Sequence, residues 1–380
     1  MSNTTTKQHM KPSLSRTPAN SKVGVVERHL RELALSRGAN AQLPTIDEMC
    51  VSYETSRATI NDALGALEAL NIVDRRRGKG IFVSPKLFQR RIALVFGDQF
   101  VVARHTSPFW DTLWANLIEE ADKRLKTHDE TISIHGVRTS DGILQPLDDN
   151  LARQLETRQI DVVVSVGLDR QSWLWIRGHD IPVVSFAGEG TYFVTIDSAK
   201  LVTMCMDKLL DAGCKSIRLW RALPANSAVI NDDAHLLNVE VVQAYRDALE
   251  RRNIPFDPAM VWVPQGERAS SEGQLQQQGE ALVDRLIAGG YAASTDGIVI
   301  LDDVMASGAY KKMLRAGIAR YIRVASHANR GTSVLYAYQE DIDRVFFDPE
   351  EIARAMFSLV DQVLADGTAA PEVVPISPTY

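Results

Sequence analysis

The chain has 380 residues, of which 45% are hydrophobic and 24% are charged. This composition excludes an intrinsically disordered protein, and the length predicts two or three domains. No apolar run approaches the roughly 20 residues needed to cross a bilayer, so we expect no association with a membrane. The three cysteines form neither a CxxC pair nor a cluster with zinc-ligand spacing. This pattern favours buried structural thiols in a reducing cytoplasm.

Charge is distributed unevenly along the chain. Residues 1–91 contain 15 basic and 8 acidic residues. The remaining residues, 92–380, contain 27 basic and 40 acidic residues. A basic segment joined to an acidic one indicates a nucleic-acid-facing module attached to a module with another task. A basic surface that is merely solvated is the alternative that charge alone leaves open. Residues 1–21 lack the apolar segment of a secretory signal and are expected to be a polar, unstructured tail.

The first ordered module is expected to begin with three helices. Residues 23–35 place apolar side chains at helical spacing and are followed by glycine and asparagine as stop signals. Thr45 precedes Glu48 by the spacing of a capping box, which predicts a short second helix. Ser56 is a suitable N-cap for a third helix, SRATINDALGALEALN. The apolar stripe of this third helix consists of Ile60, Leu64, Leu67 and Leu70.

A β-hairpin is expected after the helices. The apolar segments 72–73 and 81–83 flank the basic run Arg75–Gly80, whose two glycines permit a tight turn. Three helices and a hairpin indicate a winged helix-turn-helix, whose third helix enters the major groove of DNA. The exposed N–H groups at its start suit a phosphate, and Arg57 can reach a phosphate or a guanine edge. Cations of the hairpin would contact phosphates without reading sequence.

Residues 22–84 resemble the DNA-binding domain of the GntR family of bacterial transcription regulators. The resemblance rests on the LP pair, the SR-x-T-x-x-x-AL-x-x-L string and the RRRGKGIFV wing, which stand in register. It implies DNA contacts at Ser56, Arg57, Thr59 and Gly80. With the cap and wing residues included, the expected DNA-binding set is Thr45, Ser56, Arg57, Thr59, Asn61, Arg75, Arg76, Arg77, Gly78, Lys79 and Gly80.

Two positions depart from the family pattern. Asp47 stands where the family usually has an arginine, and Asn61 stands where an arginine is common. We expect Asp47 to repel phosphate and Asn61 to be able to read an adenine edge. The operator is therefore predicted to differ from the family's commonest one. A winged helix that serves as a protein-docking or dimerisation element is the alternative for this module.

Residues 85–90 are expected to be a linker, and residues 91–380 a module of alternating strands and helices. Apolar runs predict strands at residues 92–96, 131–137, 161–166, 181–186, 192–196, 216–220, 260–263, 297–301 and 322–325. Helical patterns occupy residues 109–125, 149–157, 198–212, 238–252, 273–288, 303–316 and 350–366. Apolar strands separated by helices indicate parallel sheets covered on both faces. A break near residues 192–200 favours two α/β lobes with a ligand cleft between them.

This order of elements resembles the LacI-type effector domain, which has the fold of periplasmic sugar-binding proteins. The resemblance covers about residues 91–380 and rests on SPFW, TIDSAKLVTMCMDKLLDAGCKSIRL, AYRDALERRNIPFDP and DGIVILDDVMASGAYKKMLRAGI. A GntR-type head on a LacI-type sensor is an arrangement known among regulators of sugar catabolism. The resemblance implies effector contacts at Ser107, Phe109, Trp110, Asp169, Arg170, Arg221, Asp302 and Asn329.

The expected cleft departs from the family as well. An arginine that many members place before the AYRDAL-type helix is Val241 here, and an expected aspartate is replaced by Ala328 or Asn329. Because those charged groups usually hold sugar hydroxyls, a conventional sugar ligand is disfavoured. Of the adjacent acids, Asp302 is predicted to face the ligand and Asp303 to cap the following helix. Five aromatic residues either stack on a flat ligand or belong to the core: Phe109, Trp110, Trp173, Trp175 and Trp220.

The sequence therefore predicts a cytoplasmic DNA-binding regulator, a repressor by the family's usual mode, controlled by a sugar or related catabolite. By resemblance it would be a homodimer on a palindromic operator, with helices 109–125 and 303–316 as candidate dimer faces. We expect no cofactor, no metal and no catalytic residue, because the paired acids lack a histidine or cysteine partner and RRRGKG lacks phosphate-loop spacing. The alternatives are a small-molecule-binding protein without operator recognition and an enzyme of unknown chemistry.

Overall fold

The computed structural model describes residues 21–136, 139–140, 143–144, 149–223, 239–365 and 370–380. The chain divides into two compact units, Met1–Arg90 and Arg91–Tyr380, which we call the N-terminal and C-terminal domains. The predicted tail lies outside the described residues except for Ser21, whose side chain caps the first helix.

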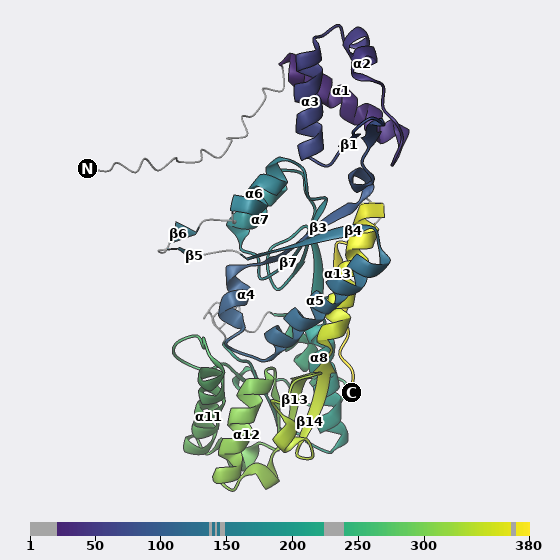
Figure 1. Cartoon of the computed structure of the whole chain (residues 1–380). Helices are drawn as coiled ribbons and strands as arrows, with labels where there is room; N and C mark the ends of the chain where they lie inside the picture. The colour runs from purple at the N-terminus through teal and green to yellow at the C-terminus, as the bar shows by residue number, and fades with distance from the viewer. Residues whose placement is uncertain (1–20, 137–138, 141–142, 145–148, 224–238, 366–369) are drawn as a thin grey trace, which may run out of the picture. The chain divides into compact units, whose positions relative to one another are not determined.

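Three helices and a two-stranded sheet make up the N-terminal domain (Figure 1). The elements are α1 (Lys22–Arg37), α2 (Ile46–Ser52), α3 (Arg57–Ala69), β1 (Val73–Arg76) and β2 (Gly80–Val83). Their shared core joins Val26 and Leu30 of α1 to Ile60, Leu64 and Leu67 of α3, all of them buried. The predicted three helices and hairpin are confirmed.

Side-chain caps explain where α2 and α3 begin. The Thr45 hydroxyl accepts a hydrogen bond from the Glu48 N–H at 3.3 Å, and the Glu48 carboxylate accepts one from the Thr45 N–H at 2.8 Å. The Ser56 hydroxyl accepts a hydrogen bond from the Thr59 N–H at 3.2 Å. Each bond satisfies a backbone amide that has no partner inside its helix. The predicted N-caps Thr45 and Ser56 are confirmed.

The C-terminal domain has two lobes. The first lobe contains a six-stranded sheet of order β15–β9–β8–β7–β3–β4. Its strands are β3 (Arg90–Phe96), β4 (Glu130–Gly136), β7 (Val162–Val166), β8 (Val183–Phe186), β9 (Tyr192–Ile196) and β15 (Val373–Ile376). The pairs β3–β7, β7–β8, β8–β9 and β9–β15 are parallel. Every residue of β7 is buried, as expected for a strand that is covered on both faces.

Helices cover both faces of this first sheet. Ile92 and Leu94 of β3 pack with α5 (Phe109–Thr127) and α13 (Pro349–Ala365), which lie side by side (Figure 1). The alternate residues Ala93 and Val95 pack with α6 and α7. The remaining elements of this lobe are α4 (Asp98–Ala103), β5 (Thr139–Ser140), β6 (Ile143–Leu144), α6 (Asp149–Glu156) and α7 (Arg170–Arg177).

A second lobe contains a five-stranded parallel sheet of order β11–β10–β12–β13–β14. Its strands are β10 (Ile217–Trp220), β11 (Val261–Trp262), β12 (Gly297–Ile300), β13 (Arg323–Asn329) and β14 (Ile342–Phe347). Its helices are α8 (Ser198–Asp211), α10 (Glu240–Glu250), α11 (Glu272–Ala288) and α12 (Asp303–Arg315). Side chains on one face of the sheet pack with α8 and α10, and those on the other face pack with α11 and α12. Short 3₁₀ helices occupy Pro85–Phe88, Pro258–Met260, Tyr291–Ser294, Ala319–Tyr321 and Tyr336–Tyr338.

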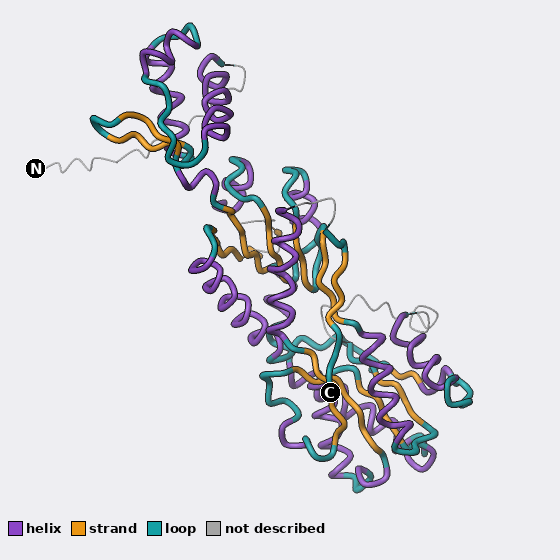
Figure 2. Tube along the Cα trace, turned by 90° about the vertical axis from the view of Figure 1, so that its right-hand side faces the viewer, coloured by secondary structure: helices purple, strands orange, loops and turns teal. Residues whose placement is uncertain are grey.

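The chain crosses between the two lobes more than once. It leaves the first lobe after Ile196 at the end of β9 and returns after Phe347 at the end of β14, so that α13 and β15 belong to the first lobe. Beyond β15, Thr379 pairs with Phe346 of the second lobe through backbone hydrogen bonds of 2.7 and 2.9 Å. The tube in Figure 2 shows strands flanked by helices in both lobes. The predicted pair of α/β lobes is confirmed, although the return of the chain was not predicted.

One predicted helix cap was wrong. Asp302, rather than Asp303, caps α12, because the Asp302 carboxylate accepts a hydrogen bond from the Met305 N–H at 2.7 Å. Asp303 is the first residue of the helix and is almost completely buried. The two residues differ by one backbone position, and only the start of the helix decides which carboxylate reaches the free amides.

Candidate functional sites

The first candidate site is the exposed start of α3 in the N-terminal domain. Ser56 and Thr59 share a hydrogen bond of 3.0 Å between their hydroxyl oxygens, beside the unpaired backbone amides of the first turn. Arg57 is the first helical residue and is exposed. These residues present two hydroxyls, one guanidinium and a helix N-terminus on one surface, which is the chemistry needed to contact a phosphate chain or a base edge.

The guanidinium of Arg57 is not free. Its Nε donates a hydrogen bond of 2.8 Å to Oδ1 of Asp47 in α2, and an Nη atom also contacts that oxygen. Hydrogen bonding to Asp47 raises the pKa of Arg57, so the guanidinium stays charged. Asp47 was expected to repel phosphate, and the structure pairs its carboxylate with Arg57.

Asn61 and Arg75 connect the third helix to the hairpin. The Asn61 side-chain amide donates to the Arg57 carbonyl at 3.0 Å, and Arg75 donates to the Asn61 carbonyl at 3.0 Å. Arg75 also forms an ion pair of 3.4 Å with Glu68 of α3. The first arginine of the wing therefore lies against α3, where it fixes the hairpin to the helix.

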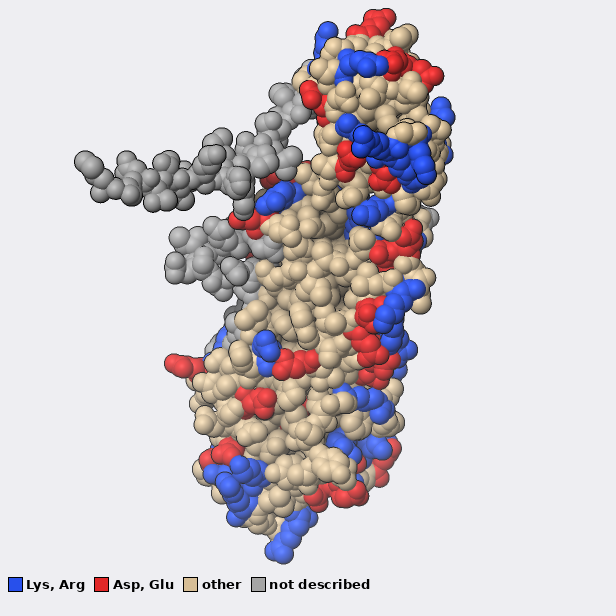
Figure 3. Space-filling view, in the orientation of Figure 1, with Lys and Arg blue, Asp and Glu red and all other residues tan. Residues whose placement is uncertain are grey.

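The remaining cations of the hairpin lie at its exposed tip. Arg76 stacks over the Phe82 ring at 4.6 Å and approaches the Asn40 side chain. Arg77 and Lys79 have no side-chain partner among the residues that the structure describes. Figure 3 shows a large group of Lys and Arg side chains at the lower right of the N-terminal domain, with others nearer its upper end. The tip thus presents exposed cations on long side chains, which suit contact with a polyanion.

Two glycines shape the turn of the hairpin. Gly78 has φ of 71° and Gly80 has φ of 116°, both in regions that residues with a Cβ atom seldom adopt. A Cβ atom on Gly80 would also lie 2.8 Å from the side-chain nitrogen of Gln42. The predicted tight turn is confirmed, and Gly80 allows the close approach of Gln42, whose nitrogen donates to the Lys79 carbonyl at 3.3 Å.

The second candidate site is a cavity of about 410 Å³ between the two lobes of the C-terminal domain. It brings together five residues of the predicted effector set: Ser107, Phe109, Trp110, Asp302 and Asn329. Among the described residues, nine that were not predicted to contact an effector also line it: Thr106, Phe186, Ala187, Val194, Thr195, Ile196, Asp303, His327 and Phe347. Several of these residues end a strand or follow one. The rule that ligands bind at the carboxyl ends of parallel strands could therefore have predicted them from the sequence.

Aromatic rings form the part of the cavity contributed by the first lobe. The Phe109 and Trp110 rings meet edge to face with centroids 5.1 Å apart, and Phe186 lies 6.0 Å and 6.3 Å from them. Trp110 and Phe109 are only partly buried, although they pack on the core. These rings are therefore able to contact a bound molecule without leaving their packing positions.

Polar groups form the part contributed by the second lobe. The Asn329 side-chain nitrogen donates to the Asp303 carboxylate at 3.0 Å, so its oxygen faces Nε2 of His327, also at 3.0 Å. Nε2 must then carry the proton that His327 donates. Burial raises the pKa of both Asp302 and Asp303, and burial lowers the pKa of His327, which favours the neutral imidazole.

Three residues of the predicted effector set do not line this cavity. Asp169 caps α7 through a hydrogen bond of 2.9 Å from the Ser172 N–H, and Arg170 is the first residue of that helix. Arg221 follows β10, and burial lowers its pKa. Trp173 and Trp175 are partly buried residues of α7 that pack on the core of the first lobe, and Trp220 is fully buried against Trp262. These three tryptophans are structural rather than ligand-facing.

Comparison with known proteins identifies the N-terminal domain. Residues 24–83 match the sequence model of the bacterial regulatory proteins of the gntR family. The uncharacterized HTH-type transcriptional regulator YurK of Bacillus subtilis is 38% identical over 69 residues, which are 18% of this chain and 28% of that protein. The probable fructoselysine utilization operon transcriptional repressor of Escherichia coli is 37% identical over 59 residues, 16% of this chain and 24% of that protein. The chain thus spans about a quarter of these curated relatives, and its N-terminal domain is a GntR-type helix-turn-helix.

Solved structures share the fold over most of the chain. The transcriptional regulator CelR in complex with cellobiose has a TM-score of 0.54 at 17% identity, over 89% of this chain and 98% of that one. A regulatory protein of the LacI family from Chloroflexus aggregans has a TM-score of 0.56 at 15% identity, over 76% and 95%. The lac repressor dimer bound to operator and the anti-inducer ONPF has a TM-score of 0.54 at 14% identity, over 83% and 95%. The C-terminal domain therefore has the two-lobed LacI-type fold.

None of the helices in the described part of the chain is long and apolar enough to span a membrane. Within the same residues, no cluster of three or more His, Cys, Asp or Glu side chains is arranged to hold a metal ion.

Proposed function

We propose that this chain, with a GntR-type DNA-binding domain followed by a LacI-type fold, is a transcription regulator whose operator affinity is set by a small molecule. The observation that carries the proposal is the combination of two independent sites on one chain. One is a helix N-terminus with an arginine beside a cationic hairpin, and the other is a cavity of about 410 Å³ between two lobes.

The DNA-binding proposal rests on named groups with separate tasks. Ser56, Arg57, Thr59 and Asn61 lie at the reading end of α3, and Arg77 and Lys79 extend from the tip of the wing. Contacts to phosphate supply affinity that falls with salt, whereas contacts of Arg57 to a base edge supply specificity. Thr45 acts through the start of α2 by closing its capping box. Repression is the mode that we assign, as in the curated repressor relative.

The effector proposal rests on the position of the cavity. Its lining includes Trp110 of the first lobe and Asp303 of the second, so a bound molecule would bridge the lobes. A ligand can favour the closed arrangement only by binding it more tightly than the open one. We propose a sugar or related catabolite that closes the lobes and thereby changes the affinity of the protein for its operator.

We propose that the regulator acts in the cytoplasm as a homodimer on a palindromic operator and has no catalytic activity. The exposed sides of α5 and α12 are the candidate dimer faces. Leu125 of α5 and Leu314 of α12 are each about half exposed, which is consistent with an apolar contact at either helix. Light scattering after size exclusion would test the dimer, and a monomeric mass at micromolar concentration would contradict it.

A fluorescence-anisotropy titration tests the proposed function. The full chain would first select its operator from random duplex DNA, and affinity would then be measured for that operator and for an unrelated duplex across a range of salt. We expect a preference of at least a thousandfold and a linear fall of log affinity with log salt. Equal affinity for both duplexes would contradict operator recognition and favour the small-molecule-binding alternative. A preference that no small molecule alters would contradict effector control.

A further inference from the structure

The cavity of the C-terminal domain has an excess of negative charge. Asp302 and Asp303 are consecutive in the chain and both line it, and none of the described lining residues is a lysine or arginine. His327 is the remaining titratable group among the described lining residues, and its burial favours the neutral ring. No cationic side chain of the described lining therefore offsets these two carboxylates.

The partners of the two carboxylates are uncharged. Asp302 accepts its hydrogen bond of 2.7 Å from the Met305 N–H, and Asp303 accepts one of 3.0 Å from the Asn329 amide. A buried carboxylate is usually stabilised by a charged partner as well as by hydrogen bonds. Among the described residues, these acids face the partial positive charge at the N-terminus of α12 and, in the case of Asp302, the imidazole of His327. Neither is a full cation while His327 is neutral, so a bound cation would supply the countercharge that the described residues lack.

The opposite wall suits a cation rather than an anion. The Phe109, Trp110 and Phe186 rings lie within 6.3 Å of one another between centroids. The face of an aromatic ring carries a negative quadrupole and attracts ammonium groups within about 6 Å of its centroid. Carboxylates from the second lobe and aromatic rings from the first lobe line the same cavity, and both kinds of group are able to attract a cation. An anionic ligand such as a sugar phosphate would be repelled by the two carboxylates.

The hydrogen-bonding groups point to the same chemistry. His327 uses its Nε2–H toward Asn329, which leaves Nδ1 as an acceptor. Carboxylate oxygens accept and do not donate, so the polar wall is rich in acceptors. A primary ammonium group offers three donors and no acceptor, whereas a hydroxyl offers one donor.

We propose that the effector of this cavity is a small organic cation, an amine or amino sugar whose ammonium group pairs with Asp302 and Asp303 while its body contacts Trp110 and Phe186. The inference rests on the proposed function, since it names the class of molecule that the regulator senses. The cavity of about 410 Å³ is large enough for a molecule of this class.

The test uses ligands matched in shape and different in charge, with the full chain. The probes are D-glucosamine, D-glucose and D-glucose 6-phosphate; 1,4-diaminobutane, 1,4-butanediol and succinate; and choline with 3,3-dimethylbutan-1-ol. Thermal shift and calorimetry at pH 7.5 would measure stabilisation and affinity. We expect at least one cation to bind ten times or more tightly than its neutral counterpart, and no anion to bind. The proposal is overturned if no cation binds, or if the neutral or anionic members bind as tightly as the cations.

Variants assign the effect to this cavity. Asp303→Asn and Asp302→Asn should each weaken binding of the cation at least tenfold, and asparagine at position 302 retains a good helix cap. Asp284→Asn, on the outer surface of α11, removes an acid outside the cavity and should leave the affinity unchanged. Unchanged binding by both cavity variants contradicts the proposal. Operator titration distinguishes failure of the cation inference from failure of the proposed function. Operator recognition without cation binding overturns the cation inference alone. Cation binding without operator recognition overturns the proposed function.

Discussion

Arg57 and Asp47 form an ion pair on the surface that α2 and α3 present in the N-terminal domain. Arg57 uses its Nε and one Nη nitrogen toward a single carboxylate oxygen of Asp47. A guanidinium has five donors in a planar fork, so the outward edge formed by its two Nη nitrogens still has donors for the O6 and N7 acceptors of guanine. Asp47 therefore orients the arginine and also lowers the net charge of the surface that we propose to read DNA.

Replacing Asp47 by asparagine is expected to reduce discrimination between DNA sequences. The variant loses one negative charge, so its affinity for an unrelated duplex rises, while Arg57 is no longer held in one orientation. The ratio of operator to unrelated affinity should fall by about tenfold, measured by anisotropy at several salt concentrations. Glu351→Gln, exposed on α13, changes the net charge equally and should leave the ratio unchanged. A ratio that matches wild type would show that Asp47 does not orient Arg57.

The cations of the wing are expected to differ in their roles. Arg77→Ala and Lys79→Ala should each weaken operator and unrelated DNA alike and lower the salt slope by about one, because each removes one phosphate contact. Arg75→Ala should leave the slope closer to wild type, since Arg75 already pairs with Glu68 and Asn61. Salt-dependent titrations of the three variants would show this order, and an equal loss of slope in all three would contradict it.

The two glycines of the wing are expected to respond differently to substitution. Gly80→Ala should destabilise the hairpin by about 1–3 kcal/mol, because φ of 116° is strained for any residue with a Cβ atom. Gly78→Asn should be close to neutral, since asparagine tolerates φ of 71° and nothing lies within 4 Å of the added Cβ. Thermal unfolding followed by circular dichroism would compare them, and equal stability of both variants would refute the argument from backbone strain.

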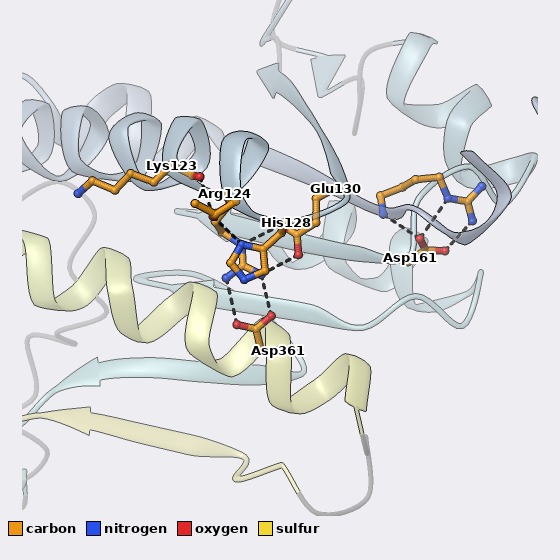
Figure 4. A network of polar contacts seen from close by, with 8 residues as sticks. Lys123, Arg124, His128, Glu130, Asp161 and Asp361 are labelled. Atoms are coloured by element: carbon orange, nitrogen blue, oxygen red, sulfur yellow. Dashed lines mark hydrogen bonds and ion pairs between the residues drawn. The ribbon is translucent and has the colours of Figure 1, made fainter. Parts of the chain in front are cut away.

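A buried ion-pair network in the first lobe is expected to support the C-terminal domain. Arg124 of α5 pairs at 2.7 Å with Glu130 of β4 and with Asp361 of α13, and its side chain is 5% exposed (Figure 4). Arg124→Met leaves the buried Glu130 without its cation and should cost about 3–5 kcal/mol. Lys123→Met, an exposed position that pairs with Glu119, is the control and should cost little. All six tryptophans lie beyond residue 91, so tryptophan fluorescence during urea unfolding reports on this domain; equal midpoints for the two variants would contradict the prediction.

The acids of the cavity are expected to make stability depend on pH in a defined direction. Burial raises the pKa of Asp303, with Asp302 and Glu272 as nearby like charges. Between the unfolded pKa of about 3.9 and the higher folded pKa, the folded chain binds more protons, so stability falls as pH rises. Asp303→Asn removes this penalty, and its Tm relative to wild type should increase from pH 4 to pH 8. Asp284→Asn should show no such trend, and a flat difference for Asp303→Asn would refute the prediction.

Local features of the sequence were sufficient to predict the secondary structure of the N-terminal domain. Thr45 and Ser56 satisfy free amides within their own first turns, and Gly78 and Gly80 adopt φ values that their missing Cβ atoms permit. The apolar runs of β7 and β12 likewise predicted buried strands. This prediction is confirmed, because every residue in both strands is buried. Elements with weaker patterns, α4, α7, β14 and β15, were not predicted. Pro375 in β15 cannot donate to a ladder, which is tolerated because β15 is an edge strand.

The sequence by itself determined the architecture: a cationic winged helix followed by two lobes of buried parallel strands, because capping, turn geometry and apolar periodicity act over a few residues. Tertiary structure alone decided which side chains meet. It paired Arg57 with Asp47, ten residues away. It also brought Trp110, Asp303 and His327 to one cavity, although Trp110 and His327 are more than 200 residues apart in the chain. It also separated Asp169, Arg170 and Arg221 from that cavity. Such contacts depend on how the chain crosses between sheets, and no local pattern of residues encodes those crossings.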